Sequence, residues 1–315
     1  MKPDLPVWRS LMYVPVNVEK YVDKAHTRGA DCIQLDLEDS VPASQKDAAR
    51  RLVPAAAKRV RRGGGDVVVR VNSPFEVTLK DLDASICADV NGIAITKTQS
   101  ADHVRRIDEC ISGLEAKRGL KFGHTSLIAM IETPAAFFQM AEIARASPRL
   151  VAMNIGGEDF ALESGMEPTE ETLLMPKQQM IFAARSGGLM PLGFIASVAA
   201  FGDWDAFGRM VRRSRQFGFM GAGCIHPGQV PIVNREYSPS PEEAAFARLV
   251  IGENMKAEAA GRASFAIDGK MIDVPVVERA RRLLARLAAI EARENQSVAA
   301  ATSSASAAPR PVGRP

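Results

Sequence analysis

The chain has 315 residues with a nearly balanced charge: 40 Lys and Arg against 37 Asp and Glu, for a net charge of +3. This balance excludes the strongly basic surface of a general nucleic-acid-binding protein, so we expect no nucleic-acid partner. No run approaches the ~20 apolar residues of a membrane span, and the N-terminus lacks the layout of a signal peptide. We therefore expect no membrane partner. The four cysteines show no metal-ligand spacing and fit a cytoplasmic protein.

Short apolar runs alternate along the chain with segments of helical periodicity, which predicts repeated β-then-α units. The predicted strands are Leu11–Pro15, Cys32–Leu37, Asp66–Val71, Asn91–Thr96, Leu127–Ile131, Leu150–Ile155, Met190–Ala196 and Ala222–Ile225. The predicted helices between them are Val18–Arg28, Ala43–Arg62, Leu79–Ala88, Ser100–Lys117, Pro134–Arg145, Leu173–Ser186 and Asp203–Phe217. Eight units within about 230 residues predict an α/β fold of the (β/α)8 TIM-barrel type. A doubly wound open sheet is the alternative.

The pattern changes after the eighth predicted strand. Ser240–Ala260 predicts a helix capped by Ser240, Asp268-Gly269 indicates a hairpin turn, and Val274–Ala292 predicts a second long helix. A barrel does not need this segment to close. We therefore predict a barrel in residues 1–235, a C-terminal lid lobe in residues 236–294, and a disordered tail rich in Ala, Ser and Pro in residues 295–315.

Acidic residues follow the fifth and sixth predicted strands. Glu132 ends the fifth apolar run, and Glu158 and Asp159 come directly after the sixth. Because the carboxyl ends of barrel strands carry the chemistry, we expect these side chains to share one rim. Glu132 and Asp159 suit Mg²⁺, which takes a few carboxylates together with water and substrate oxygens. Zinc is disfavoured, because the chain has four histidines and none pair at ligand spacing.

The second and third predicted strands also end in charged residues. Asp36, Glu38 and Asp39 are crowded together, so we expect one to pair with a cation and another to order a metal-bound water. Arg70 offers a planar fork for a substrate carboxylate. The alternative for Arg70 is an Arg–Asp pair that locks two strand ends together.

Six motifs resemble the citrate lyase β-subunit-like proteins, which are grouped with malyl-CoA and citramalyl-CoA lyases in the HpcH/HpaI aldolase family. The similarity runs from about Arg9 to Arg286, nearly the whole chain. The Asp-Leu-Glu-Asp-Ser-Val-Pro and Gly-Glu-Asp motifs are the most specific. The motifs are Arg9–Pro15, Leu35–Pro42, Val69–Asn72, Ile131–Thr133, Gly157–Asp159 and Ile225–Val230.

The resemblance implies a TIM barrel assembled as a homotrimer or hexamer. It implies Mg²⁺ bound by Glu132 and Asp159, a 2-oxo acid held by Arg70, and backbone donors from Gly157 and Glu158.

The resemblance further assigns Arg9 and Lys97 to substrate binding, with Arg9 and the segment after Pro15 near the nucleotide of an acyl-CoA. It implies that the C-terminal lobe covers a neighbouring subunit's site and delivers Asp273. The alternative for Asp273 is a plain helix N-cap, because Val274-Pro275 follows directly.

The candidate catalytic residues are Arg70, Asp273, Glu38 and Asp39. The implied enzyme is a Mg²⁺-dependent carbon–carbon lyase that cleaves or forms a β-hydroxyacyl-CoA, such as malyl-CoA or citramalyl-CoA. Its products are an acyl-CoA and a 2-oxo acid.

Two departures from the family pattern keep other functions open. Val16 replaces a glycine of the first-strand motif, and Ile195–Ala200 carries no acid where the family has Asp-Gly. The alternatives are a CoA-independent aldolase acting on a free hydroxy acid, a malate-synthase-like condensing enzyme or thioesterase, and a non-catalytic homologue that binds an oxo acid or CoA.

Overall fold

The computed structural model describes residues 5–196, 202–262 and 264–306. The chain divides into two compact units, one built on Met1–Tyr237 and the other on Ser238–Ala299. None of the described helices combines the length and apolarity that a membrane span requires.

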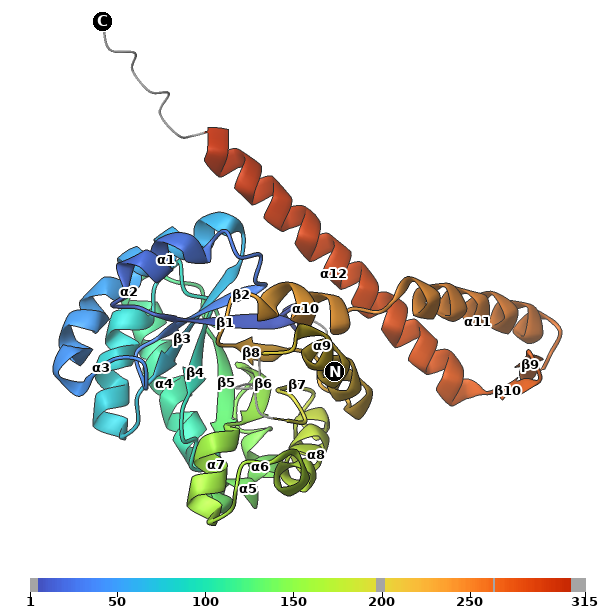
Figure 1. The fold of residues 1–315 in the computed structure, drawn as a ribbon, viewed down its shortest axis with the longest axis horizontal. Coiled ribbons are helices and arrows are strands. Elements are labelled where there is room, and N and C mark those ends of the chain that lie inside the picture. The colour runs from blue at the N-terminus through green and yellow to red at the C-terminus, as the bar shows by residue number, and fades with distance from the viewer. Residues whose placement is uncertain (1–4, 197–201, 263, 307–315) are drawn as a thin grey trace, which may run out of the picture. The chain divides into compact units, whose positions relative to one another are not determined.

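The first unit is built on eight parallel strands in the order β7-β6-β5-β4-β3-β2-β1-β8 (Figure 1). An isolated parallel bridge between Leu192 and Gly221 brings the two ends of this order together, so the sheet nearly closes. The predicted (β/α)8 TIM barrel is therefore confirmed, and the open-sheet alternative is excluded. The strands are β1 Ser10–Pro15, β2 Cys32–Asp36, β3 Asp66–Val71, β4 Gly92–Ile95, β5 Ser126–Ile131, β6 Leu150–Ile155, β7 Met190–Leu192 and β8 Ala222–Cys224.

Helices surround the barrel. They are α1 Glu19–Ala25, α2 Lys46–Val60, α3 Phe75–Ser85, α4 Ala101–Lys117, α5 Pro134–Phe137, α6 Met140–Ile143, α7 Gly157–Ser164, α8 Glu170–Ser186, α9 Trp204–Phe217 and α10 Gln229–Glu236, with 3-10 turns at Ala43–Gln45 and Arg61–Gly63. The single helix predicted over Pro134–Arg145 is in fact two short helices, α5 and α6. Helices α7 and α10 were not predicted, because each has only eight residues and begins within a few residues of a strand end. Strand β7 stops before Gly193, whose positive φ of 139° turns the chain.

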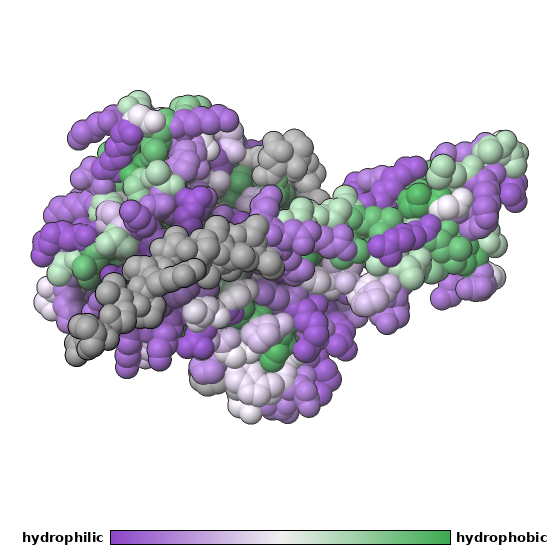
Figure 2. Space-filling view, turned by 90° about the horizontal axis from the view of Figure 1, so that it is seen from above, coloured by the Kyte–Doolittle hydropathy of each residue, from purple (hydrophilic) through white to green (hydrophobic). Residues whose placement is uncertain are grey.

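Strand alternation separates two parts of the core. On β3, Val67, Val69 and Val71 belong to the layer between sheet and helices, whereas Val68 belongs to the barrel interior. The interior is packed with side chains such as Leu11, Ile128 and Ala152, so it is a core and not a pore. In the space-filling view, hydrophilic residues predominate over the visible face of this unit (Figure 2).

The amino-terminal end of the barrel is closed. Trp8 is buried there, and its indole nitrogen donates a hydrogen bond to Asp66 at 2.8 Å. Arg9 pairs beside it with Asp31. Access to the interior is therefore from the carboxyl ends of the strands.

The second unit consists of helix α11 (Pro241–Ala259), a hairpin of β9 (Phe265–Ile267) and β10 (Lys270–Ile272), and helix α12 (Val274–Ser306) as far as Ala299. The predicted N-cap at Ser240 and the Asp-Gly turn are both present. The disordered tail predicted from residue 295 is wrong as far as Ser306, because α12 continues through this alanine-rich stretch of good helix formers. Residues 307–315 lie outside the described part of the chain.

Candidate active site

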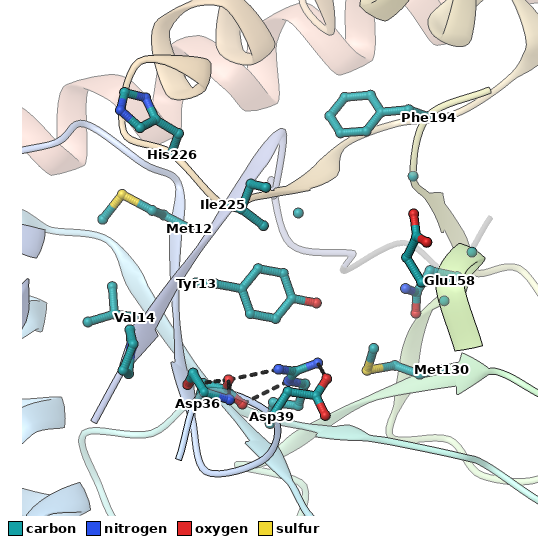
Figure 3. A pocket seen from close by; sticks show the side chains of 18 of the residues that line it. Met12, Tyr13, Val14, Asp36, Asp39, Met130, Glu158, Phe194, Ile225 and His226 are labelled. Carbon is teal, nitrogen blue, oxygen red and sulfur yellow. Dashed lines mark hydrogen bonds and ion pairs between the residues drawn. The ribbon is translucent and has the colours of Figure 1, made fainter. Parts of the chain in front are cut away.

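A cavity of about 940 Å³ opens at the carboxyl ends of the strands (Figure 3). Strand alternation explains its charged lining. Arg70 has the same parity as the interior residue Val68 on β3, and Glu132 has the same parity as Met130 on β5. Their side chains therefore continue the interior face beyond the packed core. The predicted site residues that line this cavity are Asp39, Arg70, Glu132, Gly157, Glu158 and Asp159.

Glu132 is a buried carboxylate at the end of β5, with an exposed fraction of 3%. Its Oε2 accepts a hydrogen bond of 2.6 Å from the backbone N–H of Lys97. Burial raises the pKa of Glu132 to about 7, and the neighbouring charge of Asp159 adds to this effect. A Cβ atom on Gly156 would collide with the Glu132 carboxylate, so the glycine leaves the space that this side chain occupies.

Asp159 lies in the first turn of α7, close to Glu132. Its Oδ1 is 3.5 Å from the Nζ of Lys97, whose backbone has a left-handed φ of 46°. Although burial works in the opposite direction, the charges of Asp159 and Glu132 hold the pKa of Lys97 above its ordinary value. Two acids that draw in an ammonium group in this way form a cation-attracting pair.

The donor set of this pair fits a hard cation with open positions. Among the described residues, no group of three or more His, Cys, Asp and Glu side chains is arranged to hold a metal. The protein would therefore supply two carboxylates, and water and substrate would supply the other oxygens. That is how Mg²⁺ is usually bound, whereas a structural zinc site needs four protein ligands.

Arg70 is anchored by Asp36. Arg70 Nε donates to Asp36 Oδ1 at 2.8 Å, and Arg70 Nη2 donates to Asp36 Oδ2 at 2.7 Å. Arg70 Nη1 lies 3.1 Å from Glu38 Oε2 and 3.2 Å from Asp39 Oδ2. The Arg–Asp pair that was the alternative for Arg70 is thus present, and it occupies one edge of the fork. Only the Nη1 edge, shared with two acids, remains for a substrate carboxylate.

The loop after β2 carries Glu38 and Asp39. Burial raises the pKa of Glu38 to about 8, and the adjacent Asp39 carboxylate contributes to the same effect. Lys46 Nζ donates hydrogen bonds to the carbonyls of Leu37 at 2.7 Å and Glu38 at 2.6 Å, which fixes the loop from below. Sequence reasoning missed Lys46, because a lysine in the first turn of a helix ordinarily faces solvent.

Three predicted residues lie elsewhere. Arg9 precedes β1 and therefore lies at the closed end of the barrel, where it is 3% exposed and pairs with Asp31 at 2.8 Å. The structure does not bring Arg9 to the cavity, and its assignment to substrate binding stays a prediction. Lys97 is not among the cavity-lining residues, although it contacts both Glu132 and Asp159. Asp273 belongs to the second unit, where it has the N-cap position of α12 and its Oδ1 accepts a 3.4 Å hydrogen bond from Val276 N–H.

Several cavity-lining residues were not predicted. Lys20, Lys24 and Arg28 line the cavity from α1 and the turn after it. Their spacing of four residues, directly after the first strand motif, was the signal that could have identified them. Lys177 of α8 donates to the carbonyls of Ile195 at 3.3 Å and Ala196 at 3.1 Å, and burial lowers its pKa to about 8. No sequence signal marks that lysine.

Known proteins resemble this chain over most of its length. Residues 9–227 match the model of the HpcH/HpaI aldolase/citrate lyase family. The citrate lyase subunit beta of Leuconostoc mesenteroides subsp. cremoris is 32% identical over 281 residues, covering 88% of this chain and 92% of that protein. A (3S)-malyl-CoA thioesterase of Cereibacter sphaeroides is 33% identical over 288 residues, covering 90% and 96%.

A solved structure agrees with these matches. The CitE protein of Mycobacterium tuberculosis, crystallised with magnesium, acetoacetate and coenzyme A, superposes with a TM-score of 0.69 at 26% identity and covers 91% of this chain and 100% of its own. The resemblance read from the six motifs is thereby confirmed. The chain belongs to the HpcH/HpaI aldolase/citrate lyase family of aldolase-type carbon–carbon lyases.

Proposed function

We propose that this protein is a Mg²⁺-dependent lyase that cleaves or forms a β-hydroxyacyl-CoA, with an acyl-CoA and a 2-oxo acid as the other partners of the reaction. Malyl-CoA and citramalyl-CoA are the substrates we favour. One observation carries the proposal: the Glu132 and Asp159 carboxylates face the same cavity as Arg70. A chelated keto acid needs a cation on one side and a carboxylate-binding group on the other.

Glu132 and Asp159 would hold Mg²⁺, which when bound supplies Lewis-acid polarisation of the substrate oxygens. Arg70 would orient the keto-acid carboxylate through its Nη1 edge, while Asp36 keeps the guanidinium in place. The backbone N–H groups of Gly157 and Glu158, in the first turn of α7, would donate to the same carboxylate.

The basic residues Lys20, Lys24 and Arg28 support the use of CoA. They add three basic side chains to the lining of the cavity, and binding of a small keto acid alone would not require so many. Phosphate groups of a CoA ester would neutralise them, and such contacts would compensate for the Val16 substitution. Of the acid-free loop Ile195–Ala200, residues 197–200 lie outside the described residues.

Cleavage requires three changes at the substrate. A base takes the proton of the β-hydroxyl group, the carbon–carbon bond breaks, and its electron pair forms the enolate of the thioester. The enolate carbon then receives a proton, for which Asp273 of a neighbouring subunit is our candidate. Glu38 and Asp39, whose carboxylates lie 3.1 and 3.2 Å from Arg70 Nη1, would hold the second proton of the cycle. This scheme requires an oligomer, for which we propose a homotrimer or hexamer in the cytoplasm.

The proposal is tested by mixing purified protein and Mg²⁺ with glyoxylate, pyruvate or oxaloacetate and with acetyl-CoA or propionyl-CoA. We expect Glu132→Ala and Asp159→Ala to abolish turnover and Glu109→Ala, an exposed acid on α4, to leave it unchanged. Activity in either cavity variant would contradict the metal assignment.

Two further readings of the same experiment separate the alternatives. Release of free CoA would favour the thioesterase function that one relative carries in its name. Absence of CoA binding at millimolar concentration would favour an aldolase acting on a free hydroxy acid. If CoA does bind, a Lys20→Ala/Lys24→Ala variant should bind it more weakly.

A further inference from the structure

We propose that Tyr13 is a catalytic residue whose hydroxyl donates a hydrogen bond to the oxygen on the carbon that becomes the keto group. This inference rests on the proposed function and adds a group to its site. None of the motif-based assignments includes Tyr13.

The Tyr13 ring is held between two fixed neighbours. It lies on β1, where its odd-numbered position shares the interior face with Leu11. The Arg70 guanidinium carbon lies 4.9 Å from the ring centroid, a cation–π arrangement. On β8, a Cβ atom on Gly223 would stand 2.8 Å from Tyr13 Cε2, so only glycine leaves room for the ring.

The Tyr13 hydroxyl points into the cavity. Figure 3 shows the ring at the centre of the site, with its oxygen directed toward the side where Glu158 and Met130 lie. Burial raises the pKa of Tyr13 above its ordinary value of 10.0, so the group is a neutral donor at physiological pH. Arg70 opposes this shift, and the charges of Asp36 and Glu132 reinforce it.

A second, small cavity beneath the first explains how the hydroxyl is oriented. It measures about 30 Å³ and is lined by Tyr13, Gln34 and Asn154, among others. Gln34 Nε2 and Asn154 Oδ1 are buried there with no partner among the described residues. The Gln34 amide also lowers the pKa of Tyr13, as a donor facing the phenolic oxygen does. This volume is sufficient for one water molecule. The phenolic oxygen can therefore accept a hydrogen bond from a group in the small cavity, while its O–H donates to a substrate oxygen in the larger cavity.

The donated hydrogen bond fits the charge that develops in the reaction. In cleavage, the substrate hydroxyl loses its proton to the base, and negative charge builds on that oxygen before the carbonyl forms. In condensation, the same donor polarises the carbonyl that is attacked. Tyr13 keeps its proton in both directions, so the balance of the reaction is unchanged. Because the Tyr13 hydroxyl is already oriented before the reaction begins, no free energy is needed to reorient it in the transition state.

The direct test is Tyr13→Phe, which keeps the ring and removes the oxygen. We expect kcat to fall about 10²-fold, the usual loss for one oxyanion donor. The thermal midpoint and the Mg²⁺ affinity should be unchanged. The matched control is Tyr237→Phe, whose hydroxyl donates to the Gly193 carbonyl at 2.5 Å. It should lower the thermal midpoint and keep kcat within about twofold. A Tyr13→Phe enzyme with kcat within about twofold of wild type would overturn the proposal.

Gly223→Ala is a second route to the same test, since its methyl group must displace the ring. It should reproduce the loss of kcat in the wild-type background and cost little more in Tyr13→Phe, because the two changes act on one hydroxyl. Additive losses would contradict the assignment.

A binding readout separates this inference from the proposed function. With 3-fluorotyrosine incorporated at the three tyrosines, the Tyr13 fluorine resonance should shift when Mg²⁺ and pyruvate are added, and the Tyr237 resonance should not. If the enzyme is inactive on every combination of acyl-CoA and 2-oxo acid but shows this shift, the proposed lyase function is contradicted and the Tyr13 contact is supported. No shift at Tyr13 would overturn the contact itself.

Discussion

Removal of the Asp36 carboxylate should destabilise the barrel and loosen Arg70. The side chain is 2% exposed, and it accepts hydrogen bonds from two nitrogens of Arg70 and from the backbone of Glu38 and Ser40. Breaking a buried ion pair at one partner costs about 3–5 kcal/mol, because the remaining charge stays desolvated. Glu38 and Asp39 remain beside Arg70 Nη1. We therefore expect Asp36→Ala to lower the free energy of unfolding by about 3 kcal/mol, the low end of that range.

Urea unfolding followed by circular dichroism measures this cost, and two variants calibrate it. Asp36→Asn keeps the shape and one acceptor oxygen, so we expect a smaller loss of about 1.5–2 kcal/mol. Asp47→Ala also removes an aspartate that pairs with an arginine, but the Asp47 side chain is 82% exposed. Its loss should stay below about 1 kcal/mol. Equal losses in Asp36→Ala and Asp47→Ala would refute the argument.

The pH dependence of this effect has a defined sign. Although burial opposes it, hydrogen bonding and charge from Arg70 hold the pKa of Asp36 below its ordinary value of 3.8. The stabilisation is therefore complete above that value in the unfolded chain and is lost as pH falls through the lower pKa of the folded state. The difference between wild type and Asp36→Asn should be constant above about pH 4 and shrink below it.

Three other outcomes can be checked on purified protein. Burial lowers the pKa of Lys177 to about 8 from 10.5, so the unfolded chain binds more protons between these values and stability rises with pH there. Lys177→Met should lose this rise in urea titrations on either side of about pH 9, and a retained rise would contradict the lowered pKa. Gly156→Ala should weaken Mg²⁺ binding by about tenfold or more in calorimetry, because its Cβ collides with Glu132. Gly113→Ala, which has nothing within 4 Å, should not change that affinity, and equal affinities in both variants would count against the metal site. Asp273→Asn retains an N-cap and should lower kcat by about 10²-fold without changing pyruvate affinity. If Asp203→Asn, a matched cap on α9, had the same effect, Asp273 would be a cap only.

The barrel and the centre of the site were predictable because their signals are local. Buried parallel strands are short apolar runs, and residues such as Glu132 follow them directly, so strand number and rim position could be read together. The position of Arg9 was not predictable from its motif, because motif membership does not show which end of β1 a residue occupies. A residue before a parallel strand lies at the amino end of the barrel, far from the rim.

Other features depend on tertiary structure. The local sequence does not predict that Lys177 is buried or that Asp36 pairs with Arg70, because those contacts join elements that are far apart in the chain. The end of α12 was missed for a different reason: a composition typical of disorder also contains good helix formers.

The sealed amino end of the barrel has a consequence for the order of events in turnover. Trp8 and the Arg9–Asp31 pair close the amino end of the barrel, and side chains fill its interior. Substrates and products therefore enter and leave through the opening at the carboxyl ends of the strands. In the proposed reaction the keto acid would bind near the buried Glu132 and Arg70, whereas the basic residues of α1 would keep a CoA ester nearer the entrance. The smaller product is then trapped behind the larger one. Kinetics should accordingly be sequential, with the acyl-CoA dissociating first and the keto acid last.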